Sequence, residues 1–405
     1  MMDIYQIIDQ IHLQNLDNLD ESIDGALFTD DHDALFQLGD TLLQYGLNPQ
    51  GLKVFARLFE LYPDEPDVMA YYIECLIDDN QHDKAIEALH NTPLTVERLM
   101  LEADIYQQQD MLEVAIEKVK QAYTMSSEDP IISFALAELY YFDGQYLPAA
   151  RSYEYLLNNG IDRVNNVNIQ SRLADCVLQS GDYEEAVEHY EKIDDKDMLS
   201  DDYFKMAISY QKADRIERSI QTLQTLLDKD PDYMQAYLLL VNLLESERKY
   251  NDAIIVGQKG LSLNEFYKEL LVDTGRIMIK MHNEKGIEYL IQALTIDPSY
   301  VEASLLLADY YREEEAYEDL VKLFAYIDEE DLDPTVMWHL AYSYQQLEKD
   351  TEAKHFYAES YNVLKDNALF LKDYYNYARE IADVKLAEQL YALMLQIDPN
   401  ADIDD

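Results

Sequence analysis

The amino-acid sequence predicts an all-α solenoid, a chain of helix pairs that stack one after another. Its 405 residues include only 11 Gly and 10 Pro, where average usage would supply roughly 28 and 20. All-β folds need many turns with positive φ, and dinucleotide-binding folds need glycine-rich loops, so this composition favours helices. The hydrophobic share of 48% argues against a disordered acidic chain. A regular recurrence of small residues is the third observation.

The small residues recur at nearly constant spacing. Most members are 33 or 34 residues apart, and leucine fills one of the positions. A large apolar or aromatic residue follows four positions after each member, except at Gly257. Small residues let two helix axes approach closely, and large residues one turn away fill the space beside the crossing. The series is Gly51, Ala85, Ala115, Ala149, Ala186, Ser219, Ala253, Gly286, Leu320, Ala353 and Ala387.

A weaker series of small residues lies twelve positions earlier, on the predicted first helix of each pair. Because neither helix of a pair can bury its apolar stripe alone, neighbouring pairs are expected to stack. Larger residues interrupt this series at Ile73, Val241, Thr274 and Tyr375. The members that keep it are Gly39, Ala103, Ala137, Ala174, Ala207, Ala308 and Ala341.

These residues resemble the tetratricopeptide repeat (TPR) family, whose 34-residue pattern runs Trp-x2-Leu-Gly-x2-Tyr, then Ala-x3-Phe, then Pro. The resemblance covers residues 32–399 and implies a right-handed superhelix of about eleven repeats. The chain as a whole is similar to the long acidic cytosolic TPR proteins of Bacillus-like bacteria. Two good matches are Leu38, Gly39, Gly51, Phe55 and Pro63, and Leu173, Ala174, Gly181, Tyr183, Ala186 and Tyr190.

Three segments are predicted along the chain. Residues 1–31 carry two apolar stripes and are expected to form a degenerate capping helix pair, which shields the core of the first repeat. Residues 32–399 form the solenoid, and residues 400–405 form an acidic tail. The repeats are expected to start near residues 32, 66, 96, 130, 167, 200, 234, 267, 301, 334 and 368.

Some repeats depart from the pattern. The repeat around Ala85 is short, so its second helix is expected to end near His90. A longer connection, from Asn158 to Asn166, follows the repeat around Ala149. Thr274 stands where the family prefers glycine, which predicts irregular packing and allows a bend there.

The net charge of −50 bears on partners more than on fold. A nucleic-acid binder needs a basic face, and so does a protein that binds an anionic membrane. Basic proteins or peptides, or partners with mixed apolar and basic faces, are favoured, although the charge also serves solubility alone. Cys75 and Cys176 match no metal or redox spacing and suit a reducing cytosol. Residues 1–52 contain no Lys or Arg and no long apolar run occurs, so no secretory signal or membrane span is predicted.

The resemblance implies that the first helix of each pair lines a concave, ligand-binding groove. Carboxylates occupy the same groove position in five consecutive repeats, and aromatic residues occupy neighbouring positions. We expect the carboxylates to pair with Lys or Arg of a ligand, while the rings hold aliphatic stems or cations. In so acidic a chain, the same carboxylates can simply be solvated polar residues. The predicted groove residues are Asp40, Glu74, Asp104, Glu138 and Asp175, with Phe36, Tyr71, Phe134 and Tyr141.

Three further residues are candidates for the groove. Arg172 and Lys205 share one position in adjacent repeats and could hold an acidic group together, or only offset nearby carboxylates such as Asp175. Trp338, the only tryptophan, is a candidate binding hot spot if it is exposed. Partial burial is the alternative for this residue.

No pattern in the sequence points to catalysis. It contains no phosphate-binding glycine-rich loop, no His-Glu-x-x-His and no Gly-x-Ser-x-Gly. We therefore expect no cofactor, no metal site and no enzymatic activity. The predicted function is that of a cytoplasmic scaffold, adaptor or assembly chaperone that binds a protein or peptide. A peptide-responsive regulatory protein and a self-assembling scaffold remain open alternatives.

Overall fold

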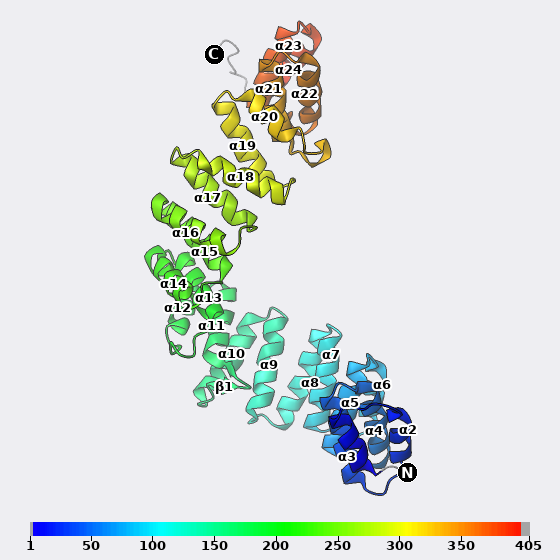
Figure 1. Ribbon diagram of the computed structural model, residues 1–405. Coiled ribbons are helices and arrows are strands. Elements are labelled where there is room, and N and C mark those ends of the chain that lie inside the picture. The colour runs from blue at the N-terminus through cyan, green and yellow to red at the C-terminus, as the bar shows by residue number, and fades with distance from the viewer. Residues whose placement is uncertain (1–2, 398–405) are drawn as a thin grey trace. The chain divides into compact units, whose positions relative to one another are not determined.

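The computed structural model describes residues 3–397, so the predicted tail at residues 400–405 lies outside the described part. It contains 24 α-helices, one short 3-10 helix and a single two-stranded hairpin (Figure 1). The prediction of an all-α solenoid of helix pairs is confirmed. The described residues form two compact units, and the division between them falls between Ala213 and Asp214.

Unit 1 begins with two short helices that precede the first full pair. The predicted apolar stripes form most of their buried face: Ile7, Ile11 and Ile23 are fully buried, whereas Leu16 is exposed. These isoleucines join the core of the first repeat, and the capping role of residues 1–31 stays a prediction. The two helices are α1 (Ile4–His12) and α2 (Leu19–Ala26).

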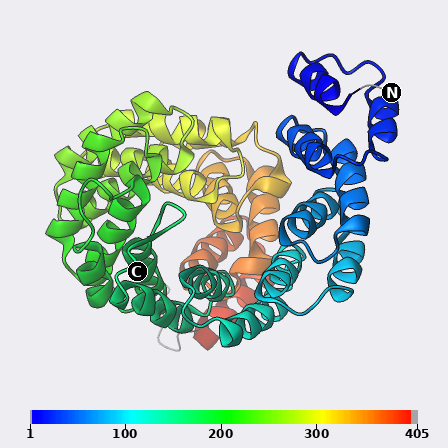
Figure 2. The ribbon, with the colours of Figure 1, turned by 90° about the horizontal axis from the view of Figure 1, so that it is seen from below.

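The remaining helices of unit 1 follow one another as antiparallel pairs along a curved path (Figure 2). Helix α6 ends at His90, as the short repeat around Ala85 predicts. The helices are α3 (His32–Gln44) and α4 (Asn48–Leu61), α5 (Pro66–Asp78) and α6 (His82–His90), α7 (Val96–Gln108) and α8 (Leu112–Met125), α9 (Pro130–Phe142) and α10 (Tyr146–Asn158), α11 (Ile169–Ser180) and α12 (Tyr183–Tyr190), and α13 (Ser200–Lys212).

Unit 2 also consists of helices that follow one another along the chain as pairs, and the lengths of its second helices vary from 8 residues in α20 to 15 in α22. The acidic run Asp328–Asp333 forms a loop around the 3-10 helix η1 (Glu329–Asp331). The helices are α14 (Ile216–Lys229), α15 (Met234–Ser246) and α16 (Tyr250–Leu263), α17 (Lys268–Lys280) and α18 (Lys285–Ile296), α19 (Val301–Glu313) and α20 (Tyr317–Phe324), α21 (Pro334–Gln346) and α22 (Asp350–Leu364), and α23 (Ala368–Glu380) and α24 (Val384–Ile397).

The recurring small residues are buried at the crossings of the helices. All eleven members of the series are buried, and Ala115, Ala186 and Ala253 have no exposed surface. A Cβ atom added at Gly286 would collide with the backbone oxygen of Gly275, so α17 and α18 approach too closely for a larger residue. The physical basis of the repeat prediction is therefore confirmed. The right-handed twist that the resemblance implies stays a prediction.

Two departures from the repeat pattern compensate each other between α16 and α17. Gly257 stands where the pattern expects a large residue, and Thr274 stands where it expects a small one. An added Cβ at Gly257 would collide with Thr274 Oγ1 and would lie 3.1 Å from Thr274 Cβ. The missing side chain at Gly257 therefore makes the room that the fully buried Thr274 occupies. The irregular packing predicted here therefore consists of a small residue at the usual large position and a larger residue at the usual small position.

The turn within each pair contains one residue in the left-handed conformation. Glycine supplies it at Gly46, Gly144 and Gly181, with φ between 73° and 87°. In the other pairs an ordinary residue adopts φ near 55–60°, which costs L-residues roughly 1–2 kcal/mol. These residues are Asn80, Asp110, Asp214, Arg248, His282, Glu315, Glu348 and Ala382.

The connection after α10 contains a β-hairpin that the sequence analysis did not predict. Strands β1 (Arg163–Val164) and β2 (Val167–Asn168) pair antiparallel, with Val164 opposite Val167. Asn165 and Asn166 form the turn with positive φ, as is common in two-residue hairpins. Asn168 then caps α11, because its side chain accepts hydrogen bonds from the backbone N–H groups of Gln170 and Ser171.

Candidate partner-binding surface

The five predicted carboxylates lie on the first helices of five consecutive pairs in unit 1. They differ in what surrounds them. Glu74 and Asp104 are exposed, and Asp40 and Glu138 are half-buried. Asp175 is buried, with 2% of its surface exposed. The sequence pattern therefore places equivalent residues in unequal surroundings.

Glu138 and Asp175 are bound by cations of the chain itself. Arg172 Nη2 donates to Glu138 Oε2 at 3.0 Å, and Tyr153 donates to the other oxygen. Lys205 and Tyr141 donate to Asp175 Oδ2, the tyrosine at 2.8 Å. Each of these basic residues comes from the next repeat along the chain. Of the two predicted roles for Arg172 and Lys205, offsetting carboxylates of the preceding repeat agrees with these contacts.

The carboxylates nearer the amino terminus have no such partner. Asp40 accepts hydrogen bonds from Tyr71 at 3.3 Å and from Gln44 at 2.9 Å, both neutral donors. Gln108 donates to Asp104 at 3.3 Å. Desolvation raises the pKa of Asp104, although the residue is exposed. Within residues 3–397, no Lys, Arg or His pairs with Asp40, Glu74 or Asp104.

The predicted rings form two groups beside these carboxylates. Phe36 packs edge-on against Tyr71, with ring centroids 5.3 Å apart, and Tyr71 stacks on Phe55 at 4.8 Å. Phe134 lies 6.4 Å from Tyr153, and the guanidinium of Arg172 lies 5.4 Å above the ring of Tyr141. Phe36, Tyr71, Phe134 and Tyr141 are half-buried, so each keeps part of its surface for contact with a partner.

Trp338 in unit 2 is buried, with 7% of its surface exposed. Its Nε1 donates to Asp373 Oδ2 at 2.9 Å. Arg312 lies 4.9 Å above the ring of Trp338. It also forms an ion pair with Asp373, which follows Arg312 by 61 residues in the sequence. Trp338 thus belongs to a polar cluster that links α19, α21 and α23, which corresponds to the burial alternative.

Sequence reasoning missed a buried ion-pair cluster in the third repeat. Glu102 is fully buried, and Arg98 Nε and Lys118 Nζ lie 2.8 Å and 2.6 Å from its carboxylate oxygens. Burial raises the pKa of Glu102, but hydrogen bonds from Lys118 and Arg98 outweigh that effect and lower the pKa. The i, i+4 spacing of Arg98 and Glu102 was the available signal.

No described group of side chains suggests catalysis or metal chemistry. Within residues 3–397, no three His, Cys, Asp or Glu side chains are placed to hold a metal ion. Cys75 and Cys176 are buried, and desolvation raises the pKa of each thiol to about 12. Thiols with such a pKa are poor nucleophiles at neutral pH. None of the described helices combines the length and the apolar character of a membrane span.

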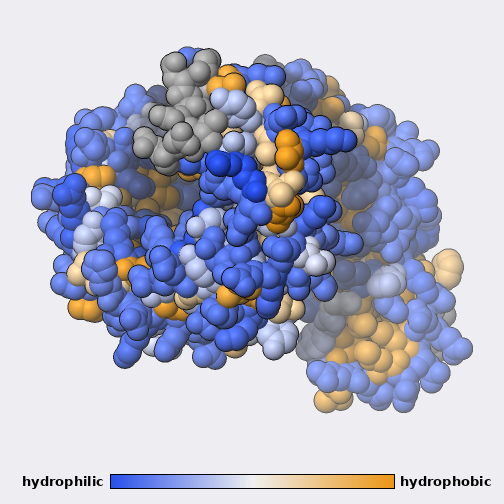
Figure 3. Space-filling model, turned by 90° about the horizontal axis from the view of Figure 1, so that it is seen from above, coloured by the Kyte–Doolittle hydropathy of each residue, from blue (hydrophilic) through white to orange (hydrophobic). Residues whose placement is uncertain are grey.

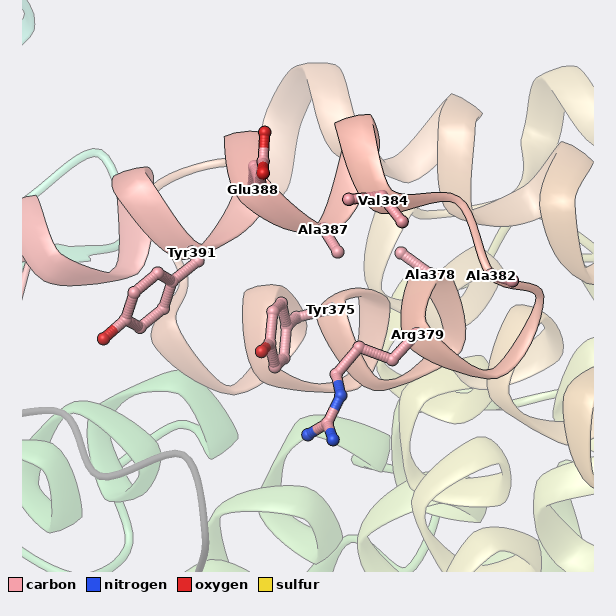
Figure 4. Close-up of a pocket in the computed structure, with 8 residues that line it drawn as sticks. All are labelled: Tyr375, Ala378, Arg379, Ala382, Val384, Ala387, Glu388 and Tyr391. Atoms are coloured by element: carbon pink, nitrogen blue, oxygen red, sulfur yellow. The ribbon is translucent and has the colours of Figure 1, made fainter.

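The face of the molecule drawn in Figure 3 is mostly polar, and hydrophobic side chains gather on it in patches, one of them at the lower right. The pockets of the described surface include two that lie between neighbouring helices. One, of about 390 Å³, lies between α3, α4 and the start of α5. The other, of about 400 Å³, lies between α23 and α24. In the second pocket Ala378 and Ala387 face each other across the helices, while the guanidinium of Arg379 extends away beside Tyr375 (Figure 4).

Stacked helix pairs with small residues buried at their crossings define a TPR protein. The family described as "YpiA-like, tetratricopeptide repeats" matches residues 107–161, and "YpiA-like, C-terminal tetratricopeptide repeats" matches residues 334–401. A general tetratricopeptide repeat family matches residues 204–266. The TPR repeat-containing protein YpiA of Bacillus subtilis (strain 168) is 31% identical over 364 residues, which cover 88% of this chain and 85% of that protein. The chain therefore belongs to the YpiA-like family of TPR proteins.

Two solved TPR structures are similar to parts of this chain at low sequence identity. The C-terminal part of a TPR repeat-containing protein from Cytophaga hutchinsonii is 16% identical, with a TM-score of 0.45 over 66% of this chain and 96% of that one. YrrB, described as a TPR protein with an unusual peptide-binding site, is 17% identical, with a TM-score of 0.38 over 46% of this chain and 96% of that one. TPR proteins mediate protein–protein interactions and are generally non-catalytic scaffolds.

Proposed function

We propose that this protein is a cytoplasmic scaffold, adaptor or assembly chaperone that holds a basic segment of a partner protein on unit 1. One contrast supports the proposal. Glu138 and Asp175 are neutralised by Arg172 and Lys205, whereas five carboxylates on α3, α5 and α7 form no ion pair within residues 3–397. Lys or Arg side chains of a partner would form ion pairs with these carboxylates, as Arg172 and Lys205 do with Glu138 and Asp175. The uncompensated carboxylates are Asp33, Asp40, Asp67, Glu74 and Asp104.

The energetics require several contacts at once. An exposed ion pair contributes about 0–1 kcal/mol, so one carboxylate cannot hold a partner. Five carboxylates on successive first helices can act together on an extended segment, and a preformed surface spares part of the ordering cost of binding. The rings of Phe36 and Tyr71 add apolar area for aliphatic stems of basic side chains. Such binding is expected to weaken as salt screens exposed charges.

A capture experiment with matched variants tests the proposal. The tagged chain is incubated with extract of its source cell at low and at high salt, and bound proteins are quantified by mass spectrometry. The groove variant carries Asp40→Asn, Glu74→Gln and Asp104→Asn. The control variant carries Glu87→Gln, Glu117→Gln and Glu154→Gln, three exposed residues on the second helices α6, α8 and α10. Both variants lose the same charge.

The wild type and the control are expected to retain the same salt-labile basic proteins, and the groove variant is expected to lose them. Equal retention by all three chains contradicts the proposal. Equal loss from both variants shows that net charge alone attracts the proteins, which also contradicts it. Sedimentation across a concentration series tests the alternative of a self-assembling scaffold. The sedimentation coefficient of such a scaffold would rise with protein concentration.

A further inference from the structure

The pocket between α3, α4 and the start of α5 combines aromatic and acidic side chains at the amino-terminal end of the repeats. Phe36 and Tyr62 contribute rings, and Leu58 and Val68 contribute a buried apolar floor. His32 Nδ1 lies 2.6 Å from the Tyr62 hydroxyl, and the two rings meet edge to face, so this side of the pocket is fixed by a hydrogen bond. The volume of about 390 Å³ accommodates one large side chain.

The charge at the pocket is negative and uncompensated. Asp33, Glu65 and Asp67 line it and are exposed, and none of them forms an ion pair within residues 3–397. Two helix amino termini, those of α3 and α5, also face this region. Each contributes about half a positive charge, so the two offset only about one of the three carboxylates. The only Lys and Arg among residues 1–83 are Lys53 and Arg57.

Both of these cations are engaged with other groups. Lys53 pairs with Asp20 at 3.2 Å and Asp24 at 3.3 Å. Arg57 pairs with Glu60 at 2.9 Å and lies 6.0 Å above the Phe28 ring. No Lys or Arg of residues 1–83 therefore neutralises the three carboxylates that line the pocket.

From this arrangement we infer that the pocket binds one lysine or arginine side chain of the basic partner segment. The aliphatic stem lies against Phe36 and Tyr62, and the charged head reaches the three carboxylates at the rim. This inference rests on the proposed function and locates one end of the bound segment. A hydrophobic side chain suits the floor but leaves the carboxylates without a partner, so the pocket discriminates by charge.

Ligand-observed NMR tests the inference with small defined probes. N-acetyl-lysine N-methylamide and its arginine analogue supply the cation, and N-acetyl-norleucine N-methylamide supplies a neutral chain of similar length. The pocket variant carries Asp33→Asn, Glu65→Gln and Asp67→Asn. The control variant carries Glu113→Gln, Glu217→Gln and Glu302→Gln, exposed residues in the first turns of α8, α14 and α19. The control variant loses the same three negative charges as the pocket variant. Its carboxylates also lie at helix amino termini, so both variants lose favourable interactions with helix dipoles.

The wild type and the control are expected to bind the two cationic probes and not the norleucine probe. The pocket variant is expected to bind the cationic probes at least about fivefold more weakly. Tyr62→Leu provides a second test, because Tyr62 is 43% exposed and its ring can be removed without opening the core. It is expected to weaken binding of the cationic probes about two- to fivefold.

Equal binding of the norleucine probe, equal weakening in the control variant, or unchanged binding in both pocket variants overturns the inference. If the pocket variant binds the probes as the wild type does while the groove variant loses its protein partners, the pocket assignment fails and the proposed function stands. If the probes bind as expected but the groove variant keeps all its partners, the pocket assignment stands and the proposed function fails.

Discussion

At the scale of single residues, Gly257 and Thr274 form a pair whose sizes are exchanged relative to the rest of the chain. The hydroxyl of Thr274 is buried and has no hydrogen-bond partner among the described residues. It occupies the volume that a side chain at Gly257 would need. The two residues should therefore be coupled energetically.

A double-mutant cycle measures this coupling. Gly257→Ala is expected to lower the free energy of unfolding by about 1–2 kcal/mol, because overpacking outweighs the gain in helix propensity. Adding Thr274→Ala removes the methyl and hydroxyl groups and should restore most of that loss. The measurement is urea unfolding of the four chains. Strictly additive effects would contradict the size exchange.

Glu102 offers a second prediction at this scale, concerning pH. Its pKa lies below the ordinary value of 4.5, so its ion pairs stabilise the folded state fully above about pH 4.5 and lose that effect as the pH falls through the folded-state pKa. Glu102→Gln is expected to lower stability at neutral pH by about 1–3 kcal/mol, because Arg98 and Lys118 lose their counter-charge. Unfolding followed from pH 7 to pH 3 should show a smaller difference between the chains at low pH. A constant difference would contradict the assignment.

The sequence predicted the burial of the small residues well, and it predicted the partners of the charged residues less well. Burial of Ala115 or Ala186 follows from a regular spacing, which a single sequence displays. The pairing of Glu138 with Arg172 and that of Trp338 with Asp373, each across adjacent repeats, depend on how side chains reach over neighbouring helices. Spacing alone does not fix that reach, so equivalent positions acquired different surroundings.

At the scale of elements, the turn within each pair is the most regular feature after the helix crossings. One left-handed residue ends the first helix in every repeat, and in most repeats it is not glycine. Among these turn residues, the match to the TPR pattern includes Gly181, whereas nothing in the sequence signals Arg248 or Glu315, because the conformation is imposed by the packing of the two helices. The hairpin at Asn165 was missed because its strands have only two residues each.

Substitutions in these turns should follow the backbone conformation. Glu348→Gly is expected to raise stability by about 0.5–1 kcal/mol, since φ is 54° there and glycine relieves the steric cost. Gly144→Ala is expected to lower stability by about 1 kcal/mol, although an added Cβ would meet no neighbouring atom within 4 Å. Thermal unfolding of the two variants tests whether the two substitutions change stability in opposite directions. A stabilised Gly144→Ala chain would contradict the account of the turns.

At the scale of the whole molecule, the chain consists of two compact units, and its only tryptophan lies in unit 2. In repeat proteins each pair contacts mainly its neighbours, so stability is a sum of local contributions. Trp338 is buried and should report the unfolding of its own surroundings. Glu102→Gln is therefore expected to shift the unfolding followed by circular dichroism while it leaves the tryptophan fluorescence transition unchanged. Equal shifts of both signals would show one cooperative unit instead.

The central claim at this scale is that the uncompensated carboxylates of unit 1 contact a basic partner segment. Site-specific photo-crosslinking tests it most directly, with a benzophenone amino acid placed at Glu74 or Asp104 and, as matched controls, at Glu87 or Glu154. We predict that the first two positions crosslink to a partner within a segment rich in Lys and Arg, and that the controls do not. Crosslinks from the control positions alone, or to acidic segments, would contradict the account.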